Sequence, residues 1–528
     1  MSFKERMPKN PKSSILGKKL NRRDALSTAG KVAVSAIVAG VIAGVGGYYA
    51  GSAATPAKTV TETVTKTRTV TVTKTEPVTA ATSPTATVTT SPTTTMATTT
   101  PTKLKPVEME LMHFFAQAQG EALKAICKKF EEKFPGCKVK PVYVENEPFK
   151  TKIRVVLPTP EAPDIFTIWV GETYLGQFIE AGLVLDLTDV WKERGWEDRF
   201  LRMGREASGV TWKGKHFGVP IDGGFNIMFY NKEIFDKLNL DVPKTFAELE
   251  QICEELKAHG IPPISLGGKD KWPVDHWYAY LMYEIAGNQY FEKLVRFELS
   301  EDVRWDDDRM IEPLRILRRF AEKEYFFGGP QGVAAWDYSA QTGNFEAERT
   351  AMMMTGSWYF YWEKPKEFEE KVGVFRLPRI TTETYPQKDM NLPWLIAPGG
   401  ALHSLQISTE AEKRGKTEAA IEFLDFFSSK EMMKVYSEYM GFGIFPMNKE
   451  LMMDPTIDLG RPGKYIKEVI ELTEQYGAAI WTNMRYHPEI DEMMLPGYLQ
   501  VITGEKAPEQ LMKEVQKKAE EILARRRS

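Results

Sequence analysis

Threonine dominates residues 55–102, and this composition prevents the segment from forming a core. It holds 23 threonines among its 48 residues, and every second residue from Thr59 to Thr75 is threonine. The alternation has the period of a β-strand, but Val, Glu, Lys and Arg share the other face, so neither face is apolar. Because large apolar side chains are missing, burial cannot offset the loss of chain entropy. We therefore predict that residues 55–106 form an extended, disordered stalk, which is a candidate for O-glycosylation.

The residues before the stalk have the pattern of a membrane-directed segment. Residues 1–31 contain nine Lys or Arg against two acids, a net charge of +7, so the rest of the chain carries −3 − 7 = −10. Residues 32–57 carry no charged side chain, and residues 32–50 would span about 28 Å as a helix, which barely crosses a bilayer. The basic flank predicts that the chain after this helix lies outside the cytoplasm. We predict a basic N-terminal region over 1–31 and a signal or transmembrane anchor over 32–54.

The export pathway and the fate of this segment stay open. Arg22-Arg23 before the apolar run resembles a twin-arginine signal, although Ala25 stands where that pattern prefers a large apolar residue. The small residues at 51–54 suit a cleavage site, but the segment would equally serve as an uncut anchor. In both cases we expect the remaining chain at the extracellular face of the cell membrane, anchored or secreted. A cytosolic enzyme is disfavoured.

Strand and helix patterns alternate after the stalk. Glu108–Phe115 is predicted to be a strand, Gly120–Phe134 an amphipathic helix and Lys138–Val144 a second strand. Such alternation predicts an α/β sheet covered by helices on both faces. Further strands are predicted at 164–169, 216–220 and 225–230, and further helices at 174–181, 246–259, 411–427 and 508–525.

The sequence lacks the motifs that are typical of several classes of function. The formal net charge of −3 gives no electrostatic reason to expect nucleic-acid binding. The six histidines are scattered without metal-ligand spacing, and no HExxH, GxSxG, Walker loop or GxGxxG motif occurs. We therefore expect no cofactor, no metal and no catalytic residue, although any two of the 72 acids could meet as a catalytic pair. Methionine runs at 352–354, 432–433 and 493–494 are expected in cores, because adjacent side chains point to different faces.

The three cysteines are expected to stay unpaired, although an exported protein can hold disulfides. Cys127 and Cys253 lie on apolar helical faces, which indicates packing. A bond between Cys127 and Cys137 would have to pass the helix stop at Pro135-Gly136. That helix end lies about 10 Å from Cys127, which strains the Cα separation that a disulfide permits.

Ten short segments match, in order, a pattern that extends over about 400 residues. Together they resemble the extracellular solute-binding proteins, family 1, of ABC sugar importers, the maltose-binding-protein-like group. The membrane segment and the Thr-rich stalk are similar to the archaeal type of this family. The segments are Pro163–Phe166, Ala181–Thr188, Gly218–Asp222, Phe229–Lys232, Pro243–Phe246, Gly260–Ile264, Ala351–Met352, Gly356–Trp358, Gly399–Gly400 and Ile407–Ser408.

The resemblance implies a two-lobed α/β fold of the periplasmic-binding-protein type II, in which the chain crosses a hinge three times. The crossings would fall near 222–226, 391–399 and 442–449, where glycines permit backbone rotation. The lobes would be 107–222 with 400–441 for lobe one, and 226–390 with 450–528 for lobe two.

A sugar site needs flat aromatic platforms and in-plane polar groups, because sugars present apolar C–H faces and a rim of hydroxyls. Several of the twelve tryptophans fall at predicted strand ends or loops. By the resemblance, Trp169 with Glu172 matches an aromatic and acid pair that contacts sugar, and Trp358 matches a stacking aromatic. We expect Arg485 at the solvated surface, and Trp191, Trp196 and Trp212 in packing. The candidate ligand-binding residues are Trp169, Glu172, Asp222, Asp270, Trp272, Trp277, Trp336, Trp358 and Trp394.

The resemblance implies a non-enzymatic, monomeric binding protein that captures a sugar, expected to be an oligosaccharide, and delivers it to ABC permease subunits in the membrane. Two alternatives stay open. A surface-tethered glycoside hydrolase would use the same aromatic cleft but need two carboxylates at a defined separation. A structural or adhesion protein of the cell surface would suit the Thr-rich stalk. The sequence does not identify the sugar, its length or its linkage.

Overall fold

The computed structural model describes residues 104–207, 210–362, 364–396 and 398–527. The predicted basic region, the predicted membrane segment and all but the last three residues of the predicted stalk lie outside the described residues. Among the helices of the described part, none is both long and apolar enough for a membrane span. The described chain has a mixed α/β fold.

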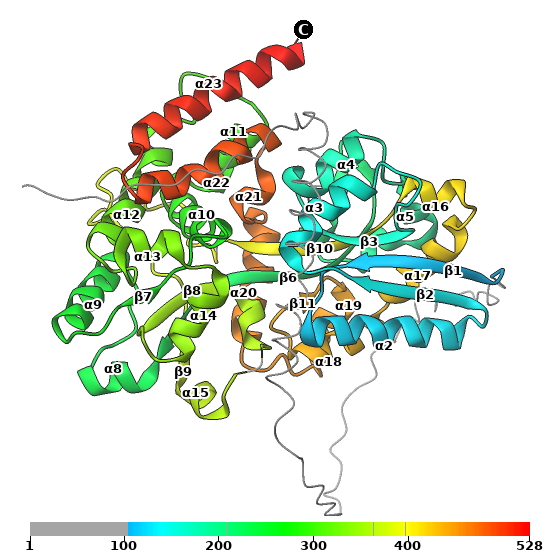
Figure 1. The fold of residues 1–528 in the computed structure, drawn as a ribbon, viewed down its shortest axis with the longest axis horizontal. Helices are drawn as coiled ribbons and strands as arrows, with labels where there is room; N and C mark the ends of the chain where they lie inside the picture. Colours follow the sequence, from blue (N-terminus) through cyan, green and yellow to red (C-terminus); the bar gives the residue numbers. More distant parts are fainter. Residues whose placement is uncertain (1–103, 208–209, 363, 397, 528) are drawn as a thin grey trace, which may run out of the picture. The chain divides into compact units, whose positions relative to one another are not determined.

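A nine-stranded sheet organises this part of the chain (Figure 1). Its strands follow the order β2-β1-β3-β10-β6-β8-β7, and β9 and β11 pair with β6 beside this path. A separate pair of short strands, β4 and β5, forms a hairpin. The strands are β1 Val107–His113, β2 Cys137–Tyr143, β3 Ile165–Trp169, β4 Thr211–Trp212, β5 Lys215–His216, β6 Val219–Asn231, β7 Ile264–Ser265, β8 Met352–Gly356, β9 Val372–Phe375, β10 Gly399–Ile407 and β11 Phe445–Pro446.

Strand β6 belongs to both halves of this sheet. Its first half pairs antiparallel with β10 and β11, and its second half pairs antiparallel with β8 and β9. These partners change between Phe225 and Asn226. Gly223, just before this point, pairs with both β10 and β11, and a Cβ there would come within 2.6 Å of the Gly400 carbonyl oxygen. Glycine therefore permits the close approach of β6 and β10 at this point.

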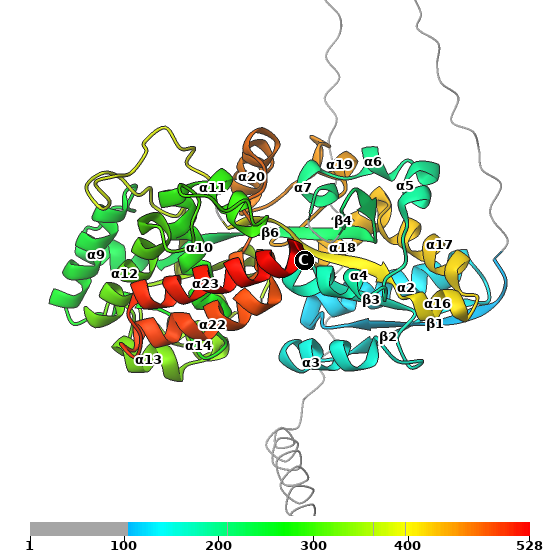
Figure 2. The same ribbon diagram turned by 90° about the horizontal axis from the view of Figure 1, so that it is seen from above.

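The buried apolar side chains form two clusters, which we call the first core and the second core. The first core contains residues of β1, β2, β3 and β10, and the helices α2, α17 and α18 pack around it. Figure 2 shows these elements on one side of β6. The helices with side chains in the first core are α2 Gln117–Lys133, α3 Asn146–Val156, η1 Glu172–Gly176, α4 Gln177–Glu180, α5 Thr188–Arg194, α6 Trp196–Arg199, α7 Arg202–Arg205, α14 Tyr338–Glu346, η2 Ser357–Phe360, α15 Lys366–Lys371, α16 Thr409–Lys413, α17 Thr417–Phe427, α18 Lys430–Met440, α19 Lys449–Met452, α20 Gly463–Tyr476 and α21 Thr482–Arg485.

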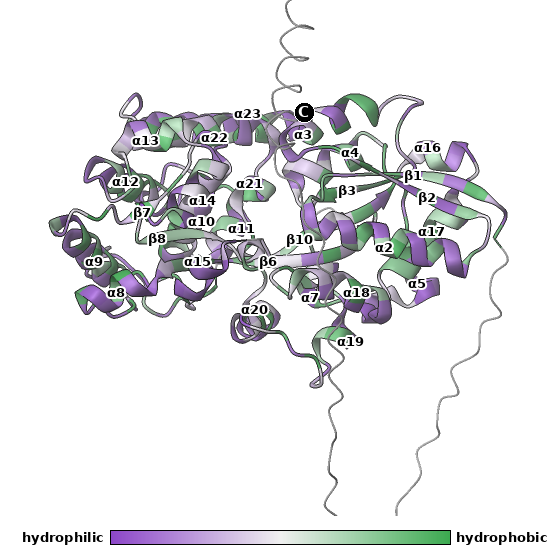
Figure 3. Cartoon of the chain, turned by 60° about the horizontal axis from the view of Figure 1, so that its bottom comes forward, coloured by the Kyte–Doolittle hydropathy of each residue, from purple (hydrophilic) through white to green (hydrophobic). Residues whose placement is uncertain are grey.

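The second core is largely helical and centres on α10, which is buried from Pro273 to Ala286. A helix that is apolar on all sides belongs in an interior, and α12, α22 and α23 pack around this region. Figure 3 shows hydrophilic and hydrophobic residues alternating along the outer helices, α9 among them. The remaining helices are α8 Lys232–Leu238, α9 Phe246–Ala258, α10 Trp272–Ala286, α11 Asn288–Val295, α12 Asp308–Glu322, α13 Gly329–Ala335, α22 Pro488–Ile502 and α23 Pro508–Arg527.

The opening β-α-β prediction is confirmed by β1, α2 and β2. Three predicted elements differ. The helix predicted over 411–427 is two helices, α16 and α17, because Gly415 adopts a φ of +69° between them. The strands predicted at 216–220 and 225–230 are mostly one long strand, β6, because the glycines between them stay extended and pair with β10.

The packing predictions for cysteine and methionine are confirmed. Cys127, Cys137 and Cys253 are free and buried, and burial raises the pKa of the Cys127 thiol to about 12. In β8, Met353 faces the first core whereas Met352 and Met354 face the second. The three adjacent methionines therefore point to different faces and fill two interiors.

Glu284 on α10 makes the second core sensitive to pH. Its side chain is buried, and its Oε2 accepts a hydrogen bond of 3.0 Å from the Ile380 backbone N–H. Burial, offset in part by Lys388, raises the pKa of this carboxyl from 4.5 to about 7. Between these values the folded protein holds a proton that the unfolded chain releases, so the free energy of unfolding falls as pH rises through this window.

We expect Glu284→Gln to remove this part of the pH dependence, because glutamine keeps the hydrogen-bond acceptor and cannot ionise. Relative to the wild type, the variant should gain about 2–3 kcal/mol of stability on going from pH 5 to pH 8. Urea unfolding at both pH values measures this difference. Glu322→Gln on the surface of α12 is the control, and an equal pH dependence in both variants would contradict the assignment.

Candidate binding cleft

A cavity of about 640 Å³ has two walls that come from different parts of the chain. Its first wall comes from the β1–α2 turn, α3, β3 and β10, and its second wall from α10, α14, η2 and α21. The volume lies within the range of small-molecule sites. Aromatic residues line both walls: Phe114, Tyr143, Trp169 and Tyr174 on the first, and Trp272, Tyr338, Trp358, Tyr361, Trp362 and Trp481 on the second or near it.

Trp169 forms the aromatic surface of the first wall. It is the last residue of β3, and its ring stacks on Phe114 with centroids 3.8 Å apart and an interplanar angle of 18°. The Lys150 ammonium lies 5.4 Å from the Trp169 ring centroid. The indole is therefore held on one side by Phe114, which fixes its orientation at the cavity.

Asp222 lies beneath the first wall and is completely buried. Its Oδ1 is 2.8 Å from Nδ1 of His403, and its Oδ2 accepts hydrogen bonds from the Tyr436 hydroxyl at 2.6 Å and from Gln119 Nε2 at 3.2 Å. His403 and Gln119 line the cavity, whereas Asp222 does not. Asp222 thus positions two side chains that face the cavity.

Trp358 and Trp272 form the aromatic surface of the second wall. Trp358 Nε1 donates to the Tyr338 hydroxyl at 2.8 Å, and the ring centroids of Trp272 and Tyr338 are 4.5 Å apart. Gly356 precedes this segment, and a Cβ there would come within 2.0 Å of the Trp358 ring. The absence of a side chain at Gly356 allows the indole to fold back against the strand.

Asp270 lies beside this surface at the cavity. Its Oδ2 accepts a hydrogen bond of 2.8 Å from the Tyr338 backbone N–H, which leaves Oδ1 for another partner. Carboxylate oxygens of this kind accept hydroxyl groups of a polar ligand.

Four of the nine predicted ligand-binding residues line the cavity: Trp169, Asp270, Trp272 and Trp358. Their contact with a ligand stays a prediction. The structure places Asp222 one layer behind the wall. Glu172, Trp277, Trp336 and Trp394 do not line this cavity.

Three of these tryptophans have packing roles. Trp277 is 1% exposed and packs on Phe326 in the second core. Trp336 packs on Phe327 with centroids 4.8 Å apart. The Trp394 ring lies under the Arg376 guanidinium, and its Nε1 donates to the Leu377 carbonyl at 3.1 Å. Trp191 and Trp196 are buried in the first core, as predicted.

Arg485 is 8% exposed, so its predicted place at the solvated surface is wrong. Its Nε donates to Glu172 on η1 at 2.9 Å, and its Nη2 donates to Glu292 on α11 at 3.0 Å. Glu172 lies in an element of the first core and Glu292 in a helix of the second. Arg485 therefore joins the two halves of the fold, and this buried ion pair explains why Glu172 does not face the cavity.

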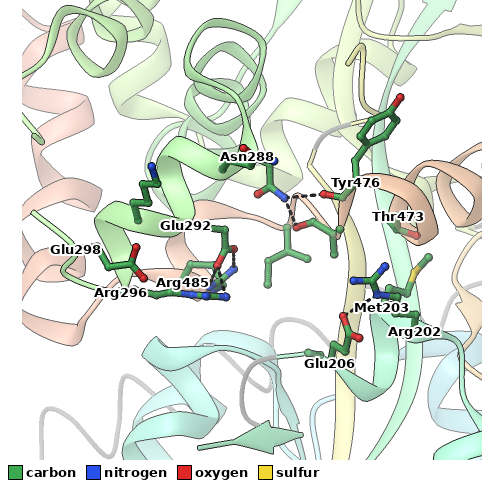
Figure 4. A pocket seen from close by; sticks show the side chains of 16 residues that line it. Arg202, Met203, Glu206, Asn288, Glu292, Arg296, Glu298, Thr473, Tyr476 and Arg485 are labelled. Atoms are coloured by element: carbon green, nitrogen blue, oxygen red, sulfur yellow. Dashed lines mark hydrogen bonds and ion pairs between the residues drawn. The ribbon is translucent and has the colours of Figure 1, made fainter. Parts of the chain in front are cut away.

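A second cavity, of about 460 Å³, is lined by two members of this ion pair, Glu292 and Arg485. Figure 4 shows Arg202 and Glu206 on one side of it and Glu292 beside Arg296 and Arg485 on the other. Most of its charged groups are already paired within the protein, Arg202 with Glu206 at 2.9 Å and Arg296 with Glu292 at 3.3 Å. The first cavity, with its aromatic walls, is therefore the better candidate for a binding site.

Sequence reasoning missed several residues of the first cavity. Gln119, His276, His403 and Asn483 line it and are buried. His276 is a single histidine inside the helix α10, and Asn483 lies in the short helix α21, whose sequence has no recognisable motif. Only the folded arrangement brings them to the same wall.

A family model and the related sequences indicate the same protein family. Residues 116–434 match the family model described as bacterial extracellular solute-binding protein. An uncharacterized ABC transporter extracellular-binding protein of Pyrococcus horikoshii is 26% identical over 379 residues, which cover 70% of this chain and 78% of that protein. The maltotriose-binding protein of Pyrococcus abyssi is 25% identical over 355 residues, 67% of each chain.

Solved structures show the same fold. A chitin oligosaccharide binding protein has a TM-score of 0.65 at 24% identity, covering 79% of this chain and 98% of that chain. A maltose-bound protein of T. maritima has a TM-score of 0.63 at 18% identity, covering 79% of this chain and 99% of that chain.

Proposed function

Because this chain belongs to the family of bacterial extracellular solute-binding proteins, we propose that it captures a sugar between two lobes and delivers it to the permease of an ABC importer. The observation that carries the proposal is the cavity with Trp169 on one wall and Trp272 and Trp358 on the other. Two opposed aromatic surfaces with polar groups between them suit the C–H faces and the hydroxyl rim of a saccharide.

An oligosaccharide is the favoured ligand. The aromatic residues of the cavity are distributed along both walls, so they can stack against more than one sugar ring. Two relatives are named for the sugars they bind: the maltotriose-binding protein and a multiple sugar-binding protein of Streptococcus mutans. These names support the sugar class without identifying the sugar.

The two lobes of the proposal correspond to the elements at the two ends of the sheet order, around β1, β2 and β3 and around β7 and β8, and the hinge to the segments that pass between them. The central part of β6 is one such segment, and the approaches to β10 and β11 are the others. The predicted boundaries of the lobes, 107–222 with 400–441 and 226–390 with 450–528, stay a prediction. The first core extends into the predicted second lobe, because side chains of α14, η2, α15 and α20 belong to it.

The proposal predicts ligand-driven closure. A saccharide that contacts both walls only in the closed form shifts the equilibrium toward that form by its differential affinity. Calorimetry of the full chain in mild detergent against maltotriose, xylotriose and triacetylchitotriose should find at least one ligand. Small-angle scattering should then show a smaller radius of gyration at saturation, and an unchanged radius would contradict closure.

The same experiment addresses catalysis. The family consists of binding proteins of transporters, so we expect the saccharide to be recovered unchanged after prolonged incubation. Chromatography of the recovered sugar measures this. Shortened products would favour a tethered hydrolase, and the failure of every saccharide to bind would favour a structural protein.

The family places the chain outside the cytoplasm. We propose that residues 32–54 hold it to the outer face of the membrane, with the Thr-rich segment 55–106 as a spacer and the folded part as a monomer. Fractionation of cells after protease treatment tests the anchor: release of the folded part without cell lysis supports it, and recovery of intact protein in the medium contradicts it.

A further inference from the structure

Two polar side chains on the second wall of the cavity have buried atoms without a protein partner. They are His276 on α10, 5% exposed, and Asn483 on α21, 4% exposed. Nδ1 of His276 and Oδ1 of Asn483 make no hydrogen bond within the described protein. Both residues line the cavity. Buried polar atoms are normally paired, so unpaired atoms at a cavity wall point to a ligand that pairs them.

His276 is surrounded by indole rings. Its ring centroid lies 4.8 Å from that of Trp272, 5.8 Å from that of Trp358 and 5.6 Å from that of Trp481. Burial lowers the pKa of His276 well below its ordinary value, so the imidazole is neutral. A neutral imidazole offers one donor and one acceptor and no charge with which to hold an anion.

Asn483 is held in place by the carboxylate behind it. Its backbone N–H donates to Asp275 Oδ2 at 3.1 Å. Oδ1 of the same carboxylate accepts from Thr482 Oγ1 at 2.5 Å and from the Tyr498 hydroxyl at 2.8 Å. This network fixes the backbone of α21 and with it the position of the Asn483 amide. The unpaired amide oxygen accepts a hydroxyl hydrogen and disfavours a negatively charged group.

The charged groups around the cavity are mostly acidic. Glu145, Glu147, Asp270 and Asp337 line it, and Lys150 is the one cation among its described lining residues apart from the histidines. Apart from the histidines, these side chains sum to +1 − 4 = −3. Lys150 already pairs with Glu147 at 2.6 Å. A carboxylate or phosphate on a ligand would therefore enter a negative field without a counter-ion.

We propose that His276 and Asn483 form the innermost hydrogen-bonding position for the saccharide, and that this cleft takes uncharged saccharides and rejects those bearing a carboxylate or phosphate. The inference rests on the proposed function and adds to it the class of sugar and two residues that select it. It also separates this chain from one of its relatives, an sn-glycerol-3-phosphate-binding protein of Agrobacterium fabrum.

Matched sugar derivatives test the charge selection. Maltotriose, xylotriose and triacetylchitotriose are each compared with the aldonic acid and the alditol made from the same sugar. Both derivatives have an opened terminal ring, so they differ in charge and not in ring structure. For each sugar that binds, calorimetry of the full chain should show the aldonic acid binding at least about tenfold more weakly than the alditol.

Asp337 provides a variant that changes the charge with little effect on the fold. Its Oδ1 caps α14 by accepting a hydrogen bond of 2.9 Å from the Ala340 N–H, and asparagine caps helices equally well. We expect Asp337→Asn to reduce the difference in affinity between the alditol and the aldonic acid. Equal binding of the two derivatives by the wild type would overturn the charge selection.

His276 is tested against a buried histidine elsewhere. His276→Phe should weaken binding of the neutral trisaccharide about tenfold or more, whereas His276→Gln, which keeps a donor and an acceptor, should stay within about threefold. His113 is the control, because it is buried with both ring nitrogens unpartnered and does not line the cavity. His113→Phe should leave affinity unchanged.

The outcomes are separable. Equal affinities of His276→Phe and His113→Phe, with both variants folded by circular dichroism, would overturn the role of His276. If His276→Phe fails to fold, His276→Gln and an Asn483→Leu variant carry the test, with a loss of affinity expected only for the latter. If none of the three neutral trisaccharides binds the wild type, the proposed function itself fails.

Discussion

Replacing Trp358 with alanine is expected to raise the dissociation constant of the bound saccharide by about ten- to hundredfold. Trp358 is half-buried at the cavity, and its indole is oriented by the hydrogen bond to Tyr338. Removing an aromatic platform loses roughly 1.5–3 kcal/mol of apolar burial, which corresponds to this change in affinity. Calorimetric titration of wild type and variant with the best trisaccharide measures it.

A matched control distinguishes a tryptophan that stacks on the ligand from one that only packs within the protein. Trp336 is also half-buried near the second core, packs on Phe327 and does not line the cavity. Trp336→Ala should lower the melting temperature of the free protein and leave affinity unchanged. Trp358→Ala should do the reverse, with only a small loss of stability. A large loss of stability with affinity retained would assign Trp358 to the core.

Replacing Arg485 with methionine is expected to destabilise the fold by about 3–5 kcal/mol. The change removes the shared partner of Glu172 and Glu292, whose side chains are each 22% exposed. A buried ion pair contributes little net stability, but loss of one member leaves charges that neither water nor protein compensates fully. Since both carboxylates retain some access to water, the lower end of the range is expected. Urea unfolding measures the free energy.

Arg318 is the control for this variant. It pairs with Glu322 at 2.7 Å on the surface of α12, with side chains 35% and 54% exposed. Such pairs contribute about 0.3–0.5 kcal/mol, so Arg318→Met should change stability little. A double variant, Arg485→Met with Glu292→Gln, should recover part of the loss. Similar small effects of Arg485→Met and Arg318→Met would show that the ion pair is not a significant link.

The local order of the fold could be predicted because it depends on neighbouring residues. The period of apolar side chains identified β1, α2 and β2, and adjacent methionines in β8 point to opposite cores as alternation requires. The break between α16 and α17 was missed, since a single glycine at 415 inside an apolar pattern is also tolerated in helices. The union of two predicted strands in β6 depends on pairing with β10, far along the chain.

The site was predicted only in part, for the same reason. Trp169 and Trp358 could be proposed because they match sugar-contact positions of the family that the sequence resembles. Trp272 was proposed from a predicted loop, although it is the first residue of α10. Glu172 was also predicted to bind the ligand, but it pairs with Arg485, which is 313 residues away in sequence. His276 lies in a helix that reads as core on every face, and only the fold shows that one of its faces borders a cavity.

The position of β10 has a consequence for how the chain is made. β10 lies between β3 and β6 in the sheet, yet it follows β6 in sequence by 399 − 231 = 168 residues. On the ribosome the amino-terminal sheet stays open along β3 and β6 until those residues have been synthesised. At about 5–20 residues per second this interval lasts roughly 8–34 s. Throughout it the nascent chain presents two unsatisfied strand edges, which a chaperone or a translocase can hold before the sheet closes.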